Sequence, residues 1–117
     1  MAPAFAHFAI GGAIGLLALA CISLRYPRTL DYRLSVLVLC GIWATVPDIH
    51  HAIALFDPAL GHQARVIHDT PWADVFFLHY TLDRAIVRAH AIETIGIAAA
   101  LLVVAWATTK IRVIQTR

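Results

Sequence analysis

Histidine and aspartate side chains interrupt the apolar segments of this sequence at several places. The stretch Pro47-Asp48-Ile49-His50-His51 ends a long apolar run, and His79 stands four residues before Asp83 in a shorter one. A charged residue at membrane depth costs about 2.5–3.5 kcal/mol on insertion scales, so it is by default part of a functional site with partners nearby. Neutral imidazole with carboxylate is the usual ligand set for zinc in hydrolytic sites, and for manganese or iron where carboxylates dominate. The pattern predicts a divalent metal centre, with zinc as the expected ion.

The predicted metal ligands are all histidines or aspartates that adjoin apolar segments. They are His7, Asp48, His50, His51, His68, His79 and Asp83. This set exceeds what one ion needs, so either two ions are bound or some members orient the true ligands through hydrogen bonds. On a helix, His79 and Asp83 share one face. If residues 48–51 are helical, Asp48 aligns with His51; if Pro47 forces an extended path, it aligns with His50, and both options stay open.

Other polar residues beside these ligands supply the remaining parts of a hydrolytic site. A metal-bound water has its pKa lowered towards about 7, and a spare carboxylate can then accept its proton. Asp69 is the predicted catalytic base. Guanidinium groups hold phosphate and other anions well, so Arg65, Arg84 and Arg88 are predicted to bind an anionic head group.

The composition is that of an integral membrane protein. Of the 117 residues, 61% are hydrophobic and 14% charged, with a mean hydropathy of +0.77, whereas soluble domains carry about 25% charged residues. The nine Lys and Arg residues stand at segment ends and form no basic run, so nucleic-acid binding is not expected. Cys21 and Cys40 lie in separate apolar runs and suggest neither a redox pair nor a thiolate metal site.

We therefore predict an all-α membrane protein with a single domain over residues 1–117, a bundle of three to four transmembrane helices of which one is short or partial. The predicted spans cover residues 4–24, residues 34–56 with an interruption at Pro47, and a last segment running to about residue 109. Residues 57–71 are predicted to form a polar loop. Residues 72–82 are too few to span, and are predicted to form an interfacial or re-entrant helix or half of a tilted span.

Two further patterns concern packing and topology. Gly11 and Gly15 are spaced to allow close approach of another helix, and His7 lies on the same face, which predicts that it faces protein rather than lipid. Basic residues gather in the first loop and in the C-terminal tail, which places both on the cytoplasmic side. These residues are Arg25, Arg28, Arg33, Lys110, Arg112 and Arg117, against Arg65, Arg84 and Arg88 on the other side.

Several of these motifs resemble those of the small membrane-bound metal-dependent hydrolases, the group that includes the inner-membrane LexA-binding-type hydrolase. His7 matches the histidine at the head of the first span. Residues 47–51 match a Pro-Asp-x-Asp-His motif, with His50 where the family has an acid, and residues 79–83 match a later His-x-x-x-Asp. The segment from His62 to Asp69 stands where the family has a histidine-containing loop, with one more residue between its histidines. The resemblance implies a four-helix membrane fold, a divalent metal and hydrolysis of a phosphoester.

The expected function is therefore a metal-dependent hydrolase in the cell membrane, acting on a phosphoester or lipid head group at the membrane face, with membrane lipids as partners. The alternative is a non-catalytic small subunit that packs against other membrane subunits. Haem ligation by histidines on two spans is a third reading, which the carboxylates oppose because haem iron needs none.

Overall fold

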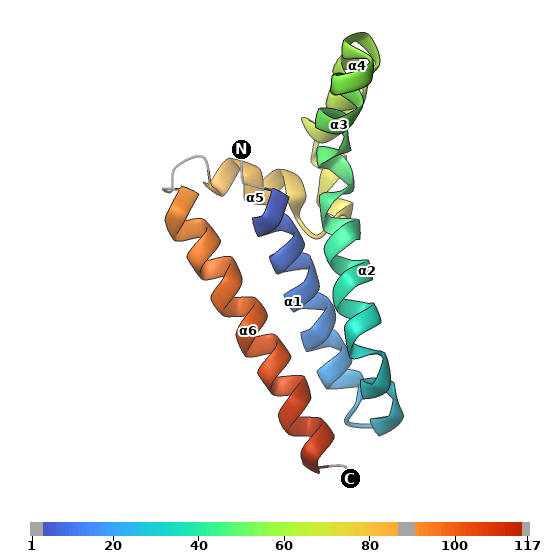
Figure 1. Ribbon diagram of the computed structural model, residues 1–117, viewed down its shortest axis with the longest axis vertical. Helices are drawn as coiled ribbons and strands as arrows, with labels where there is room; N and C mark the ends of the chain where they lie inside the picture. The colour runs from blue at the N-terminus through green and yellow to red at the C-terminus, as the bar shows by residue number, and fades with distance from the viewer. Residues whose placement is uncertain (1–3, 87–90, 116–117) are drawn as a thin grey trace.

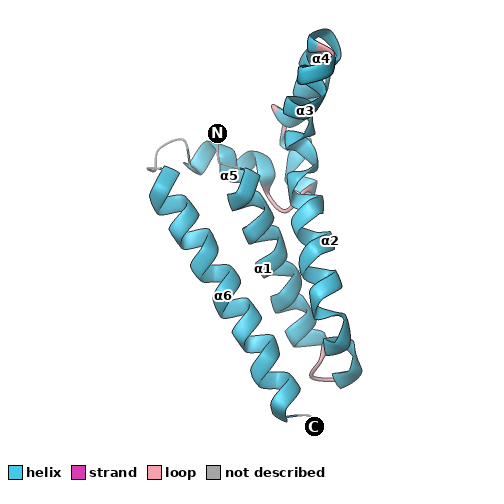
Figure 2. Ribbon diagram, in the orientation of Figure 1, coloured by secondary structure: helices cyan, strands magenta, loops and turns pink. Residues whose placement is uncertain are grey.

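A computed structural model describes residues 4–86 and 91–115 of the chain. In this part of the chain every regular element is helical (Figure 2), which confirms the all-α prediction. The α-helices are α1 (Ala4–Ile22), α2 (Arg33–Thr45), α3 (Ile49–Phe56), α4 (Pro58–His68), α5 (His79–Ile86) and α6 (Ala91–Gln115). Three short 3-10 helices join them: η1 (Pro27–Tyr32), η2 (Val46–Asp48) and η3 (Pro71–Val75).

Helix α1 lies between α2 and α6 and packs against both (Figure 1). The contact with α6 is made of small residues, with Ala6 and Ala9 of α1 buried against Ala98, and Ala13 and Leu16 against Ala105. Small side chains let two backbones approach closely where no hydrophobic effect drives association, as in a bilayer. Helix α1 is therefore the central helix of the bundle.

The predicted close-packing face of α1 meets α2. A Cβ atom added to Gly11 would lie 2.5 Å from the Ala44 Cβ and 2.6 Å from the Cys40 carbonyl oxygen, and one added to Gly15 would lie 2.6 Å from the Cys40 Sγ. No side chain larger than hydrogen fits there without movement of α2. This contact confirms that the Gly11 and Gly15 face packs against a helix.

Three helical stretches of the described residues are long and apolar enough to cross a membrane: Ala4–Ile22, Pro27–Phe56 and Glu93–Ile111. This finding matches the three-span form of the prediction, with the short α5 as the partial element. The segment η1 contacts α6, and the Arg33 guanidinium lies 5.6 Å from the centre of the Trp106 ring. The first basic loop and the C-terminal end of α6 thus lie at the same end of the bundle (Figure 1).

The predicted interruption at Pro47 is present. The helix formed by α2 changes to the 3-10 turn η2 at Val46–Asp48 and resumes as α3, because proline has no N–H to donate to the preceding turn. Beyond this point α3 and α4 form a hairpin that projects past the end of α1 (Figure 1).

The prediction of a polar loop over residues 57–71 is wrong. Most of this segment is helix α4, which begins where the Asp57 carboxylate accepts hydrogen bonds from the N–H groups of Ala59 and Leu60 at 2.9 and 3.0 Å. Pro58 then takes the first helical position, where its missing N–H is no loss. Gly61 packs closely on Ala54 of α3 and completes the hairpin.

Residues 72–82 form two short pieces rather than one helix. The chain leaves η3 and reverses through Phe77 and Leu78, which have φ values of 53° and 61°, a left-handed conformation that costs non-glycine residues about 1–3 kcal/mol each. Helix α5 then starts at His79. The Asp74 carboxylate accepts hydrogen bonds from the Thr81 N–H at 2.8 Å and the Thr81 hydroxyl at 2.7 Å, which caps the first turn of α5.

Candidate metal centre

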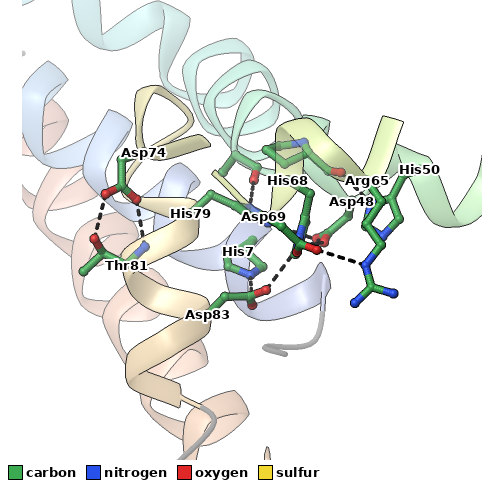
Figure 3. Close-up of polar contacts among 12 residues, drawn as sticks. His7, Asp48, His50, Arg65, His68, Asp69, Asp74, His79, Thr81 and Asp83 are labelled. Carbon is green, nitrogen blue, oxygen red and sulfur yellow. Dashed lines mark hydrogen bonds and ion pairs between the residues drawn. The ribbon is translucent and has the colours of Figure 1, made fainter. Parts of the chain in front are cut away.

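Two histidine and aspartate groups meet where the start of α1, the η2 turn, the end of α4 and the start of α5 come together (Figure 3). One group is His7, His79 and Asp83, and the other is Asp48, His68 and His79; in each group the potential ligand atoms all lie within 4.8 Å of one another. His79 belongs to both, so the five residues form one cluster, which we call the histidine-aspartate centre.

The nitrogen-to-oxygen distances in the centre are short. His7 Nε2 lies 3.1 Å from Asp83 Oδ1, and His68 Nε2 lies 3.2 Å from Asp83 Oδ2. Asp48 Oδ1 lies 3.6 Å from His68 Nε2 and 3.5 Å from His79 Nε2. Ligands about 2.1 Å from a tetrahedral zinc ion are about 3.4 Å from each other, since the tetrahedral edge is about 1.63 times that bond length. The observed separations bracket this value.

The centre is closed to water on most sides. His7, His68 and His79 are 1%, 4% and 0% exposed, and Asp83 is 9% exposed. The burial of His7 confirms that it faces protein. Its ring stacks on that of His79 with centroids 3.9 Å apart and planes 22° from parallel, so their nitrogens do not point at each other from opposite sides, as two axial haem ligands must.

Hydrogen bonds on the far nitrogens fix which atom of two imidazoles faces the centre. The His79 Nδ1–H donates to the Ala44 carbonyl at 3.0 Å, and the His68 Nδ1–H donates to the Asp69 carboxylate at 2.8 Å. Because these acceptors hold no proton to give, the Nε2 atoms of the neutral rings carry lone pairs. Those lone pairs are directed at carboxylate oxygens, an arrangement that is repulsive unless a proton or a metal ion lies between the two atoms.

Four atoms near this point are buried and make no hydrogen bond within the described part of the protein. They are Asp48 Oδ2, His50 Nε2, His68 Nε2 and His79 Nε2. Buried polar atoms are nearly always paired, so each needs a reason. Coordination of a divalent ion by the imidazole nitrogens would supply that reason for His68 and His79.

The electrostatics of the groups outside the predicted spans follow from these contacts. Burial lowers the pKa of His79, but the close contact of its Nε2 with the Asp48 carboxylate, its hydrogen bond to the Ala44 carbonyl and the charge of Asp83 together raise the pKa above the ordinary value. The hydrogen bond from His68, with a further one from Arg65, holds the pKa of Asp69 below its ordinary value against the smaller effect of burial.

The remaining predicted residues lie around the centre. His50 is 3% exposed, its Nδ1–H donates to the Pro47 carbonyl at 2.8 Å, and its ring lies 4.7 Å from that of His68. His51 is exposed, and its ring lies 3.9 Å from that of His50 with the two planes tilted by 37°. Both lie outside the two ligand groups found among the described residues.

The predicted base Asp69 and two of the predicted anion-binding residues, Arg65 and Arg84, are exposed. The Asp69 carboxylate contacts His68 Nδ1 with one oxygen and Arg65 Nε, at 3.1 Å, with the other. The Arg84 guanidinium stacks over the Tyr80 ring at 4.6 Å. Arg88 lies outside the described residues. The role of Asp69 as a base remains a prediction, whereas its contact with Nδ1 is that of a carboxylate that orients the His68 imidazole.

Sequence reasoning missed two contributors to the site. The Ala44 carbonyl orients His79, and a backbone oxygen leaves no signal in a sequence. Asp74 caps α5, the helix that carries His79 and Asp83. In the sequence, this contact is indicated only by an acidic residue that precedes the segment of α5, and such a pattern is weak evidence for a cap.

No protein-family model, curated protein or solved structure matches this chain.

Proposed function

We propose that this protein is an integral protein of the cell membrane that binds one divalent metal ion, zinc being the first candidate, and hydrolyses a phosphoester at the membrane face. The observation that carries the proposal is the histidine-aspartate centre, in which imidazole lone pairs and carboxylate oxygens face each other at distances suited to a shared ion. These distances between side chains could not be predicted from the sequence motifs.

One ion, rather than two, follows from the chemistry of His79. This residue belongs to both ligand groups, and its Nδ1 is used by the Ala44 carbonyl. A neutral imidazole has only one lone pair left, at Nε2, and can serve one ion. The ion would be held by His79 together with members of both groups, and the rest would support it.

A bound divalent ion would supply activated water, whose pKa it lowers towards about 7. A nearby carboxylate would have to accept the proton of that water. Asp48 Oδ2 is buried and without a hydrogen bond, and its other oxygen faces the centre. It is thus better placed than Asp69, whose carboxylate is engaged by His68 and Arg65.

The depth of the centre supports a substrate at the membrane face. Trp72 is 79% exposed in η3, which joins the two helices α4 and α5 that meet at the centre, and Tyr26 and Tyr32 are 62% and 65% exposed at the opposite end of the bundle. Tryptophan and tyrosine gather at the two membrane interfaces, so the centre lies near one of them. Arg65 and Arg84 are exposed at this level and are the candidates to hold an anionic head group.

The direct test is metal analysis of the protein purified in detergent without added metal. We expect about one equivalent of a divalent ion, lost in the double variant His79→Ala, Asp83→Ala, and loss of hydrolysis of bis-(p-nitrophenyl) phosphate with it. His62→Ala is the matched control, because His62 is exposed on α4 and outside both ligand groups. A wild-type protein that binds no ion when zinc, manganese and iron are supplied would overturn the proposal.

A second candidate function is that of a non-catalytic subunit. It is favoured by the tip of the α3–α4 hairpin, where Leu55 and Phe56 are 83% and 91% exposed beyond the end of α1. Large exposed apolar side chains of this kind mark interaction sites. A stable larger assembly in mild detergent, broken by Phe56→Ser with metal content unchanged, would support this function.

A further inference from the structure

An apolar groove of about 230 Å³ runs along α1 and α2 below the histidine-aspartate centre. It is lined by Ile14, Gly15, Ala18, Leu19 and Ile22 of α1, Val36 and Cys40 of α2, and Phe77 from the turn before α5. Ile14 and Ile22 on its rim are 37% and 51% exposed. The groove therefore lies on the outside of two helices that are apolar enough to cross a membrane, where lipid chains surround the protein.

The groove lies close to the centre along both helices. On α2, the Ala44 carbonyl holds His79, and Cys40, one turn away, lines the groove. On α1, Gly15 follows His7 by eight residues, a separation of about 12 Å at about 1.5 Å per residue. That distance is less than half of a hydrocarbon core about 30 Å thick. One extended acyl chain can thus lie in the groove while its head group lies at the centre.

Phe77 and Leu78, the two residues that link the groove to His79, have a strained left-handed backbone. Phe77 lines the groove, and His79, two residues later, is a member of both ligand groups. The left-handed backbone at Phe77 and Leu78 turns the chain between them. Strain of this kind, about 1–3 kcal/mol for each residue, persists where the surrounding structure enforces it and is concentrated at functional sites. Here it places an aromatic ring over the groove and an imidazole in the centre.

We propose that this groove, the α1–α2 groove, binds one acyl chain of a membrane lipid whose phosphate head group is the substrate of the centre. The part of this inference that makes the lipid a substrate rests on the proposed function. The binding of an acyl chain in the groove does not depend on that function. A volume of 230 Å³ is below the roughly 300–1,000 Å³ of pockets that enclose compact ligands, and it suits a single chain. The lining offers one thiol and otherwise only hydrocarbon and aromatic surface.

The test is photo-crosslinking in nanodiscs that contain phosphatidic acid with a diazirine in the middle of one acyl chain. We expect labelled peptides to map to Val36, Cys40 and Phe77 in preference to the exposed faces of α2 and α6. Ala18→Phe should fill the groove, because Ala18 is exposed and lines it, and should abolish that preference. Leu17→Phe is the matched control, since Leu17 is 45% exposed on the same helix and does not line the groove.

The two proposals fail in different ways. Label spread evenly over the lipid-facing helices, or unchanged in Ala18→Phe, would overturn the acyl-chain site while leaving the metal centre in place. Preferential labelling of the groove in a protein that binds no metal would support the groove and overturn the hydrolase. Thermal unfolding and metal content of Ala18→Phe, measured beside those of Leu17→Phe, separate a filled groove from a misfolded protein. Val36→Phe is the second filling variant if Ala18→Phe unfolds.

Discussion

His7 and Asp83 stand 76 residues apart in the sequence, and their side chains meet at 3.1 Å between Nε2 and Oδ1. Both are buried at the level where α5 crosses the start of α1 (Figure 3). A buried carboxylate that loses its partner is strongly destabilising, by about 3–5 kcal/mol for buried pairs. The pair therefore ties α5 to α1 as well as contributing to the centre.

Replacing His79 by alanine should remove the ligand that the two groups share. We expect metal affinity to fall by more than the roughly 10–100-fold typical of residues that only support a ligand, as measured by competition with a fluorescent chelator. His62→Ala should leave affinity unchanged. Equal affinity in a folded His79→Ala protein would show that the ion is held elsewhere.

Asp69→Asn should weaken metal binding without removing a ligand. The amide cannot replace the charged hydrogen bond to His68 Nδ1, made at 2.8 Å, so affinity should drop by about 10–100-fold. The d–d absorption of a cobalt-substituted protein should shift at the same time, which a purely structural change would not produce. Asp31→Asn, outside the centre, is the control, and an unchanged cobalt spectrum would contradict the orienting role.

Adding a methyl group at Gly11 should separate α1 from α2. The new Cβ would meet the Cys40 carbonyl at 2.6 Å, and backbone cannot move aside cheaply, so Gly11→Ala should lower the free energy of unfolding by about 1–3 kcal/mol. Gly96→Ala is the matched control, because a Cβ there has no neighbour within 4 Å and alanine favours helix by about 1 kcal/mol. Melting temperatures of the two variants should move in opposite directions.

The capping contact of Asp74 should give the stability of α5 a dependence on pH. Burial raises the pKa of this carboxyl, but the hydrogen bonds from Thr81 outweigh it and hold the pKa below its ordinary value. A depressed folded-state pKa adds stability above the unfolded-state pKa, and that stability is lost as the pH falls through the folded value. Asp74→Ala should cost about 1 kcal/mol near neutral pH and less in acid. A loss that is independent of pH would argue against the capping role.

The arrangement of the basic segments predicts the topology. The η1 loop lies at the same end of the bundle as the end of α6, and basic residues favour the cytoplasmic side. In a protein without its native cysteines, Gln63→Cys should react with a membrane-impermeant maleimide added to intact cells, and Arg28→Cys should react only after lysis. The reverse pattern would place the centre on the cytoplasmic face.

Much of the centre could be predicted because its residue types are rare in apolar segments. The spacing of His79 and Asp83 gave their common face, and the spacing of His7 and the two glycines gave the face of α1 that packs inward. The α4 helix was missed because its polar composition outweighed the Asp57-Pro58 start signal. The partners of His68 and His79 could not be predicted, since they depend on where a carbonyl and an exposed carboxylate lie after folding.

The position of the donors along the chain also bears on how the protein is made. All five residues of the histidine-aspartate centre precede α6, so the ligand set leaves the ribosome before that helix does. Metal capture can therefore come before insertion of the final span. An ion bound at that stage would join α1, η2, α4 and α5 in the nascent protein, and α6 would dock onto a surface of α1 that is already fixed.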